Sequence, residues 1–538
     1  MEKLIWSQPF IKHMEKFALL LPLLVFPLAF PLHILVSSVE SINYKKIYAI
    51  VVSKSTFNDP SWHRVVEDLK EKYDGSVFTY EKDVFDVRRD LARLAPDYVC
   101  FVARPNEANP EFVKRVNRLI RELDDDPYPD AVWSILTGFS HEDALRIVHC
   151  NGFTVRRVLS GTAAGWLDYV REGIATSETQ YCKMRIKYAN GSIKEVRGPK
   201  DRTLLLASLI STNRFDIFIT SGHGYHNRWQ LHYPETGYEG FFRSKKGRVY
   251  GEAYNGTIRY INSTNPKIYF GLGNCYIGSI INEDSMPLAW IHSGHAYFYS
   301  GYVIEEGPRS YMLGGIPAYF FVQDNYTWAE AFFANGISLI FDMLHNTPGT
   351  DPSWLRTDVD GAALYGEPAL EVRVDRVVKP LYSKHIHVEP IGDGRYRITV
   401  KVRMNRDGKP GWNGKWGNRH PVIILPFRVE NITVLKTNAY EAVVLDNAVL
   451  LHIWKKGDPP LKVGDERYVV FTASPMKRPR RVNLRGEYFP YKIVAVLVAA
   501  IAAGILAVKK ILKRGLARGE RIKYLKWDFR QAFQNPCQ

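Results

Sequence analysis

Uninterrupted apolar segments bounded by glycine or polar residues recur along the first two thirds of the chain. The two most informative are residues 215–220, followed by Ser-Gly-His-Gly, and residues 268–272, followed by Gly-Asn-Cys. Apolar runs of this kind are typical of strands buried on both faces of a parallel sheet. We therefore expect two central strands that carry His223 and Cys275 at their carboxyl ends, where the ligand crevice of such a sheet lies.

Strand-like and helix-like segments alternate around these two runs, which is the pattern of βαβ units. The further expected strands are 46–53, 76–80, 98–103, 131–136 and 296–303, and the expected helices are 60–73, 84–94, 110–123, 140–150, 203–211, 287–292 and 327–344. Residues 370–374 are expected to close this unit. Asn190-Gly191 predicts a tight hairpin turn, interpreted as an excursion from the main sheet. The aromatic and glycine-rich segment 225–265 predicts loops or a hairpin that wall the crevice.

The pattern changes between about residue 378 and residue 473. Apolar and polar residues alternate there, as in 395–402, 422–429 and 468–472. A run of strands of this size without an amphipathic helix is typical of a β-sandwich. The hydrophobic pattern thus predicts an α/β unit followed by an all-β domain.

Composition adds domain number and the distribution of charge. At 538 residues with 46% hydrophobic content, the chain has material for two or three domains. The formal net charge of +16 is uneven, because nine Lys and Arg residues lie between Lys509 and Arg530. No recognition motif accompanies this basic tail, so nucleic acid is not an expected partner.

Two apolar segments predict contact with a membrane. Residues 491–508 have the composition of a transmembrane helix, preceded by a basic linker at 476–490 and followed by a basic cytoplasmic tail at 509–538. Residues 1–38 read as a signal peptide or an amino-terminal anchor, and the sequence leaves the choice open. Either fate places the chain from residue 39 to about 490 on the external face of the membrane.

Sequons and cysteines agree with an exported chain. The five potential glycosylation sequons begin at Asn190, Asn255, Asn262, Asn325 and Asn431. Among the cysteines of the external stretch, Cys100 lies inside an apolar strand pattern and is expected in the core. Cys150 and Cys182 are candidates for a disulfide.

Cys275 and His223 together provide the chemistry for attack on a carbonyl group. A thiol is only partly ionised at neutral pH, so a nucleophilic cysteine needs a neighbouring base, which also protonates the leaving amine. Cys275 could instead be a buried structural cysteine, and His226 is a rival for the base. His223, His226 and His232 could also form a metal cluster, although no carboxylate stands at a familiar spacing.

The order of these motifs resembles the clan of cysteine peptidases that holds caspases, legumain, clostripain, separase and the gingipains. Its shared pattern is an apolar block, His-Gly, a spacer, a second apolar block and a small residue before Cys. The gingipain family looks closest, because Asp130-Ala-Val-Trp, Ser140-His-Glu-Asp and Leu364-Tyr-Gly-Glu-Pro-Ala-Leu are similar to further landmarks of that family. The resemblance spans roughly residues 46–374. It departs from the family at Trp133-Ser-Ile, where Gly-Arg is frequent.

The resemblance implies a fold and a set of site residues. It implies a caspase-like, doubly wound, mostly parallel sheet over residues 39–375 and an immunoglobulin-like sandwich over residues 376–475. The backbone N–H groups of Gly224 and Cys275 would stabilise the oxyanion, and Asp130 would orient His223. A strand-end aspartate that caps a turn explains Asp130 almost as well.

Asp143 has two interpretations. The resemblance allows it to be an acidic group in the substrate pocket, where a carboxylate would pair with a basic side chain. Ser140 and Asp143 also have the spacing of a helix-capping box, which is the interpretation that the local sequence favours.

The expected function is that of a membrane-anchored extracellular cysteine endopeptidase. Its substrates would be proteins or peptides, and its chemistry would require no metal or other cofactor. A catalytically inactive surface or binding protein on the same fold is the first alternative. A metal-dependent hydrolase that uses the cluster of His223, His226 and His232 is the second.

Overall fold

The computed structural model describes residues 44–177, 179–231, 238–305, 318–345, 352–411 and 419–478. The segments predicted to be a signal peptide or anchor (1–38), a transmembrane helix (491–508) and a cytoplasmic tail (509–538) lie outside these ranges. No helix in the described ranges combines the length and the hydropathy that a bilayer span requires. The chain divides into compact units of residues 1–45 and 46–538, and the helices and strands described below belong to the second unit.

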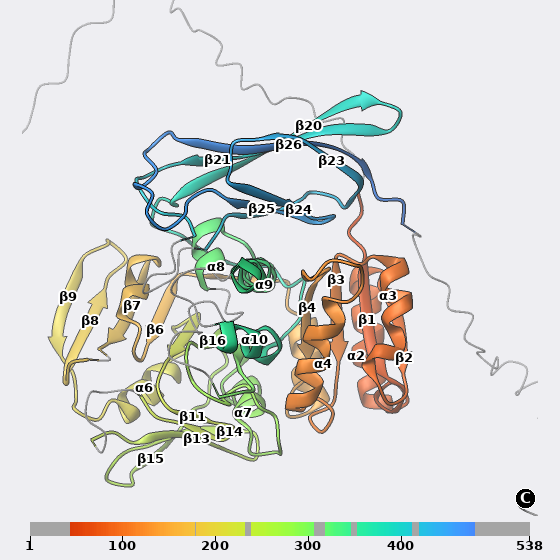
Figure 1. Ribbon diagram of the computed structural model, residues 1–538. Coiled ribbons are helices and arrows are strands. Elements are labelled where there is room, and N and C mark those ends of the chain that lie inside the picture. The colour runs from red at the N-terminus through yellow and green to blue at the C-terminus, as the bar shows by residue number, and fades with distance from the viewer. Residues whose placement is uncertain are drawn as a thin grey trace, which may run out of the picture. The chain divides into compact units, whose positions relative to one another are not determined.

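A twelve-stranded sheet forms the centre of the second unit (Figure 1). The spatial order is β2-β1-β3-β4-β18-β17-β16-β10-β6-β7-β8-β9. The strands are β1 Tyr48–Ser53, β2 Ser76–Tyr80, β3 Tyr98–Val102, β4 Val132–Leu136, β6 Arg157–Ser160, β7 Glu172–Thr176, β8 Lys183–Lys187, β9 Ile193–Arg197, β10 Ile217–Thr220, β16 Lys267–Gly271, β17 Ala296–Tyr302 and β18 Ala362–Tyr365. Neighbours pair in parallel except at β17–β18, β7–β8 and β8–β9. The predicted α/β fold with a mostly parallel central sheet is therefore confirmed.

The antiparallel β17–β18 pair divides this sheet into two halves of opposite strand direction. Strands β1 to β4 run with β18, whereas β6, β7, β10 and β16 run with β17. The carboxyl ends of β10 and β16 therefore share an edge with the amino ends of β4 and β18. A residue that follows the carboxyl end of β4 lies at the opposite edge.

Helices cover both faces of the sheet. The helices are α1 Lys54–Phe57, α2 Pro60–Tyr73, α3 Arg88–Leu94, α4 Pro110–Ile120, α5 His141–Val148, α6 Thr203–Ile210, α7 Met286–His292, α8 Ala318–Asp324, α9 Trp328–His345 and α10 Pro352–Gly361. Trp290 of α7 packs on Tyr269 and Trp328 of α9 packs on Phe270, with ring centroids 4.8 and 5.3 Å apart. Because consecutive residues of a strand point to opposite faces, α7 and α9 lie on opposite sides of β16.

The helix starts follow from local chemistry. α2 and α4 both begin with proline, which has no N–H to lose at a helix start. The preceding side chains, Asp59 and Asn109, accept the backbone N–H groups of Ser61 and Phe112 at 2.9 Å. The helix expected over 84–94 begins instead as a 3₁₀ turn, Val84–Val87, before α3.

The segment between β10 and β16 forms a separate antiparallel sheet of order β11-β12-β13-β14-β15. Its strands are β11 Gly224–Tyr225, β12 Arg228–Trp229, β13 Phe241–Lys245, β14 Arg248–Glu252 and β15 Ile258–Tyr260. The expectation of loops or one hairpin was too simple. Trp229 stacks on Phe242 at 4.4 Å, and both rings pack against Phe218 of β10, so an aromatic cluster attaches this sheet to the central one.

The carboxyl-terminal part forms two antiparallel sheets, of order β20-β21-β26-β23 and β22-β25-β24. The strands are β20 Tyr382–Gly392, β21 Arg395–Met404, β22 Val422–Ile424, β23 Val429–Thr437, β24 Glu441–Val444, β25 Ala448–His452 and β26 Glu466–Pro475. The predicted change from a parallel to an antiparallel pattern is present. This change falls between β19 Val372–Val374 and β20. Strand β19 still forms a parallel pair, with β5 Phe153–Val155.

The antiparallel sheets share a buried interface with the α/β part. Arg428, with 3% of its surface exposed, pairs with Asp446 and donates to the carbonyl oxygens of Pro96 and Asp130. The apolar core is also continuous and extends from β1 to β25. Both parts accordingly lie in one compact unit rather than in two.

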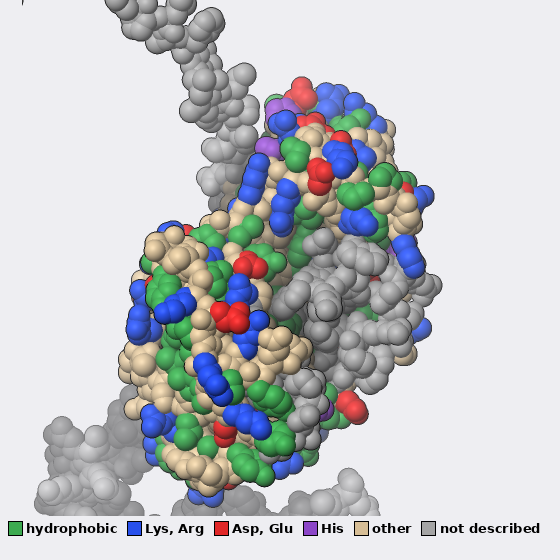
Figure 2. All heavy atoms as spheres, turned by 90° about the vertical axis from the view of Figure 1, so that its left-hand side faces the viewer, with side chains coloured by type: hydrophobic (Ala, Val, Ile, Leu, Met, Phe, Trp, Pro, Cys, Tyr) green, Lys and Arg blue, Asp and Glu red, His purple; other side chains and the backbone are tan. Residues whose placement is uncertain are grey.

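The β8–β9 hairpin differs from its prediction. It does have a tight turn at Asn190-Gly191, and the Gly191 φ of 85° fits glycine. It is not an excursion, because β8 pairs with β7 and extends the central sheet. On the face of the molecule that carries this end of the sheet, Lys and Arg side chains are interspersed with acidic and apolar ones (Figure 2). The described residues visible on that face therefore form no single basic patch.

Candidate active site

His223 and Cys275 follow two adjacent parallel strands. β10 pairs with β16 so that Thr220 is opposite Gly271. His223 comes three residues after the end of β10, and Cys275 comes four residues after the end of β16. Both loops therefore leave the same edge of the sheet side by side, as expected for a catalytic pair at this position.

Gly224 shows that the two loops are in direct contact. A Cβ atom on Gly224 would lie 2.7 Å from the carbonyl oxygen of Cys275 and 2.9 Å from Cβ of Asn274. Contacts this short with backbone leave room for glycine and for no larger residue. Gly222 has a φ of 125°, which also favours glycine. The two glycines that flank His223 are thus required by a sharp turn and by a close approach.

Backbone pairing sets the direction of the Gly224 N–H group. The N–H group of Gln230 donates to the carbonyl oxygen of His223 at 3.0 Å, so these two residues form a hydrogen-bonded pair of the β11–β12 hairpin. Because such pairs alternate, Gly224 and Trp229 form a non-hydrogen-bonded pair. The N–H group of Gly224 consequently points away from β12, as an oxyanion donor would need to.

Cys275 is partly exposed and is followed by a strained residue. Tyr276 has a φ of 55°, in the left-handed region that non-glycine residues seldom occupy. Hydrogen bonds from Tyr276 N to Ile304 O at 2.9 Å and from Gly278 N to Tyr302 O at 2.8 Å hold the turn against β17. Strained conformations of this kind are concentrated at functional sites.

The four described cysteines, Cys100, Cys150, Cys182 and Cys275, form no disulfide with one another. The predicted bridge between Cys150 and Cys182 is therefore wrong. Cys150 lies between α5 and β5, whereas Cys182 precedes β8 near one end of the strand order of the central sheet. The prediction of Cys100 as a core residue is confirmed, because its side chain is fully buried.

Asn274 is a functional candidate that the sequence did not single out. Its side chain is fully buried, its Oδ1 accepts the Thr220 hydroxyl at 3.0 Å, and its Nδ2 donates to Gly222 O at 3.1 Å. The Thr220 hydroxyl also lies 2.9 Å from the Tyr269 hydroxyl. A polar residue next to the proposed nucleophile was visible in the sequence, but its partners depend on how β10 and β16 pair.

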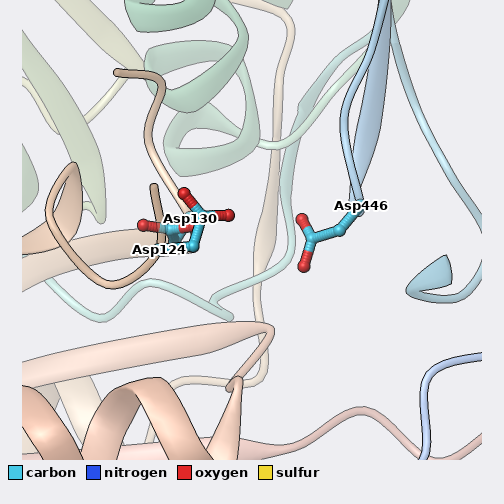
Figure 3. Close-up of side chains that lie close together, drawn as sticks. All are labelled: Asp124, Asp130 and Asp446. Carbon is cyan, nitrogen blue, oxygen red and sulfur yellow. The ribbon is translucent and has the colours of Figure 1, made fainter. Parts of the chain in front are cut away.

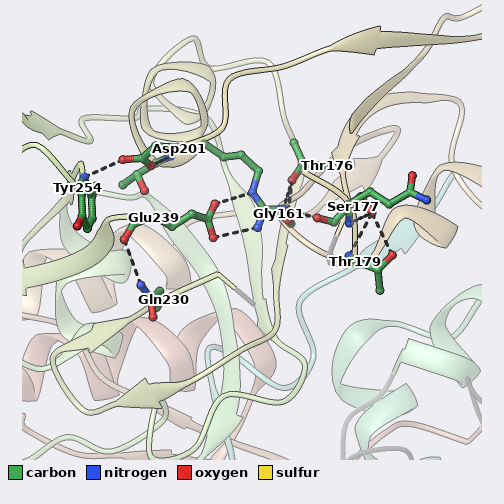
Figure 4. Close-up of polar contacts among 11 residues, drawn as sticks. Gly161, Thr176, Ser177, Thr179, Asp201, Gln230, Glu239 and Tyr254 are labelled. Atoms are coloured by element: carbon green, nitrogen blue, oxygen red, sulfur yellow. Dashed lines mark hydrogen bonds and ion pairs between the residues drawn. The ribbon is translucent and has the colours of Figure 1, made fainter. Parts of the chain in front are cut away.

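A second network holds the His223 loop from the side of β6. The N–H and hydroxyl groups of Ser221 donate to the Thr162 hydroxyl at 2.9 and 2.8 Å. Next to Thr162, Gly161 O accepts Arg202 at 2.8 Å, and Arg202 forms a buried ion pair with Glu239 (Figure 4). This ion pair therefore stabilises the loop that supports Ser221.

The structure does not bring Asp130 to His223. Asp130 precedes β4, and β4 lies four positions from β10 in the sheet order, or about 19 Å at the usual strand spacing. Its carboxylate accepts Leu123 N at 3.2 Å and lies near Asp124 and Asp446 (Figure 3). The implied role in orienting His223 is thus corrected: Asp130 caps its own turn.

Protonation fits this structural role of Asp130. Burial and the negative charge of Asp124 raise the pKa of Asp130 to about 9. The group therefore carries a proton at neutral pH. Arg428 balances the charge of Asp446 in the same cluster.

Asp143 belongs to the helix cap and not to a pocket beside Cys275. Its carboxylate accepts Ser140 N at 3.2 Å, pairs with Arg146 at 3.2 Å and lies 3.0 Å from His292 Nδ1. Burial raises the pKa of Asp143, but the hydrogen bond with His292 and the charge of Arg146 lower it below its ordinary value overall.

Asp143 cannot reach a substrate bound at Cys275, because the two residues lie at opposite edges of the central sheet. Arg146 lies over the ring of Tyr297, near the amino end of β17, at a distance of 5.0 Å. Cys275 lies beyond the carboxyl end of the parallel neighbour β16. Both roles of Asp143 were open at the level of sequence, because the opposite directions of the two half-sheets could not be read from the hydrophobic pattern.

His226 lies in the tight turn between β11 and β12. Its carbonyl oxygen accepts Met286 N at 2.7 Å, and its Nδ1 is buried with no hydrogen-bond partner among the described residues. Burial lowers its pKa below the ordinary histidine value. His232 lies outside the described residues. Among those described, Asp124, Asp130 and Asp446 are the one group of three or more ligand-type side chains close enough to share a cation.

Comparison with known proteins adds no family. Models of known protein families do not match the chain, and no curated protein shows significant similarity to it.

Proposed function

We propose that this protein is a cysteine endopeptidase in which Cys275 is the nucleophile and His223 is the general base and acid. The observation that carries this proposal is the contact of Gly224 with the backbone of Asn274 and Cys275, because it fixes the two loops against each other. Adjacent parallel strands, a partly exposed thiol and a strained following residue support it.

The reaction would proceed in two halves. The Sγ atom of Cys275 attacks the peptide carbonyl while His223 takes the thiol proton, and His223 then gives that proton to the leaving amine. The resulting thioester is hydrolysed by water, which His223 deprotonates. The N–H groups of Gly224 and Cys275 would donate to the oxyanion in both halves, and each such donor contributes roughly 10²-fold to 10³-fold in rate.

The wider architecture supports the same proposal. We infer a caspase-like arrangement for the α/β part and an immunoglobulin-like arrangement for the two antiparallel sheets. We also propose that residues 491–508 anchor the chain in a membrane, with the peptidase part outside the cell and the tail inside. Protease treatment of intact cells tests this topology, because a tag after Gln538 should be protected while residues near Asn431 are digested.

Substitution of the two site residues tests the activity. Cys275→Ala should abolish cleavage of a peptide library, and His223→Ala should lower it by at least about 10³-fold. Cys182→Ala is the matched control, since Cys182 is also partly exposed and forms no disulfide with a described cysteine. His226→Ala should leave most of the activity.

Each contrary result points to a different function. Cleavage that persists in Cys275→Ala would refute the assignment. Loss in EDTA together with indifference to iodoacetamide would favour a metal-dependent hydrolase. A folded wild-type protein that cleaves no peptide and does not react at Cys275 would favour an inactive binding protein.

A further inference from the structure

The amide of Asn274 connects the two loops that carry the proposed catalytic pair. Asn274 precedes Cys275 in the chain, and its Nδ2 donates to the carbonyl oxygen of Gly222, which precedes His223. The side chain is fully buried. One side chain therefore spans from the residue before the nucleophile to the residue before the base.

The contacts of this amide fix the orientation of the His223 backbone. The peptide plane before His223 is held by Asn274 through Gly222 O, and the plane after it is held by Gln230 N through His223 O. The other end of the amide is fixed by Thr220 at the end of β10. A rotation of either plane would move the imidazole relative to the thiol.

We propose that Asn274 is a positioning residue that sets the distance and orientation between His223 and Cys275. This inference rests on the proposed function of that pair. Asn274 touches neither the scissile bond nor the oxyanion. It acts through the carbonyl oxygen of Gly222, and the essential part of its side chain is the Nδ2 donor.

Asn274→Asp separates positioning from simple packing. Aspartate has the same shape and still accepts the Thr220 hydroxyl, but an ionised carboxylate cannot donate to Gly222 O. Two acceptors would then face each other in a buried site. Displacements of about 1 Å cost catalysis roughly 10²-fold, so we expect a loss of that size at about pH 8 in labelling by a peptidyl acyloxymethyl ketone.

Lower pH should restore the labelling rate of Asn274→Asp. A buried carboxyl group beside a carbonyl oxygen takes up a proton more readily than in water, and the protonated form is again a donor. The ratio of variant to wild-type labelling should therefore rise toward one as the pH falls from about 8 to about 5. His223, Cys275 and Tyr269 are the titratable groups around Asn274. They are present in both proteins, so the ratio of the two labelling rates removes the contribution that the proteins share.

Asn117→Asp provides a matched control. Asn117 is also a buried amide whose Nδ2 donates to carbonyl oxygens, among them Ala362 O at 3.0 Å, but it lies on α4 in the other half of the sheet. It should lower the melting temperature without changing the labelling rate of the folded protein. Asn274→Ala should reduce labelling at every pH, without rescue.

Different results would refute the proposed function of the pair and the proposed role of Asn274. Absence of labelling in the wild type would refute the proposed function. Labelling of the wild type and of Asn274→Asp at equal rates at about pH 8, with both proteins folded, would refute the role of Asn274 alone. A pH-independent loss in Asn274→Asp would also overturn it, because packing would then be the cause.

Discussion

At the scale of single residues, the contacts of Asp130 differ from the role in orienting His223 that the resemblance implied. Its carboxyl group is protonated at neutral pH and accepts Leu123 N. Asn is the neutral isostere of this form. Asp130→Asn should therefore leave labelling at Cys275 unchanged, whereas a residue that orients the base would cost activity heavily.

The same variant has a pH signature in stability. The pKa of Asp130 is raised to about 9 in the folded state, whereas the unfolded chain has the ordinary pKa of an aspartate. Between these two pKa values, the folded state keeps a proton that the unfolded state releases. Stability contributed by this group is present at low pH and is lost as the pH rises toward 9. Denaturation of Asp130→Asn should show a shallower fall above about pH 5, with a gain over the wild type that grows by up to roughly 1.4 kcal/mol per pH unit and reaches several kcal/mol at about pH 8. An unchanged slope would contradict the protonated state.

The position of a site residue in the fold could be predicted where it depended on one strand. It could not be predicted where it depended on the order of the strands in the sheet. His223 and Cys275 each end an apolar run, so their edge of the sheet could be predicted. Asp143 could not be placed, because the reversal between β17 and β18 decides which strand ends share an edge. Asp130 could not be placed, because its distance from His223 depends on the order of the strands between β4 and β10. Asn274 was visible only as a neighbour of the nucleophile.

At the scale of elements, the contact between the loops after β10 and β16 has no room for a side chain. Gly224→Ala would place a methyl group against the backbone of Cys275 and Asn274. We expect a loss of stability of about 1–3 kcal/mol and a larger loss of labelling, because the Cys275 loop must move. Gly165→Ala is the control, since a Cβ atom there meets nothing within 4 Å. Thermal denaturation and labelling of both variants measure the two effects, and equal labelling would show that the loops are not apposed.

Elements with strong patterns were predicted closely, and short ones were not. The proline start of α2 and the apolar runs of β10 and β16 gave their positions within a few residues. The short strands β5, β6 and β7 have no sustained pattern, and they were missed. The segment that forms the sheet β11–β15 was expected to form loops or a hairpin, because glycines and aromatic residues suit these structures as well as a sheet.

At the scale of the whole molecule, Arg428 connects the antiparallel sheets to the α/β part. Its guanidinium is buried among Asp446, Pro96 O and Asp130 O. Arg428→Met would leave Asp446 without this partner, and removal of one member of a buried pair costs about 3–5 kcal/mol. Exposed Arg397, which pairs with Glu389 at 3.2 Å, is the control, and Arg397→Met should cost less than about 1 kcal/mol.

Cooperativity follows from the same interface. Because the core is continuous from β1 to β25, the wild type should unfold in one transition when followed by near-ultraviolet circular dichroism and by calorimetry. Two separate transitions in the wild type would show that the antiparallel sheets unfold independently.

The central claim is that Cys275 and His223 act as a pair, and the rate of alkylation measured cysteine by cysteine tests it most directly. Limited iodoacetamide treatment near neutral pH, followed by peptide mass spectrometry, compares Cys275 with the partly exposed Cys150 and Cys182 in one sample. The thiolate is the reactive form, so a paired Cys275 should react at least about tenfold faster than the other two, and His223→Ala should remove that advantage. Equal rates for the three cysteines, or a Cys275 rate that His223→Ala leaves unchanged, would contradict the account.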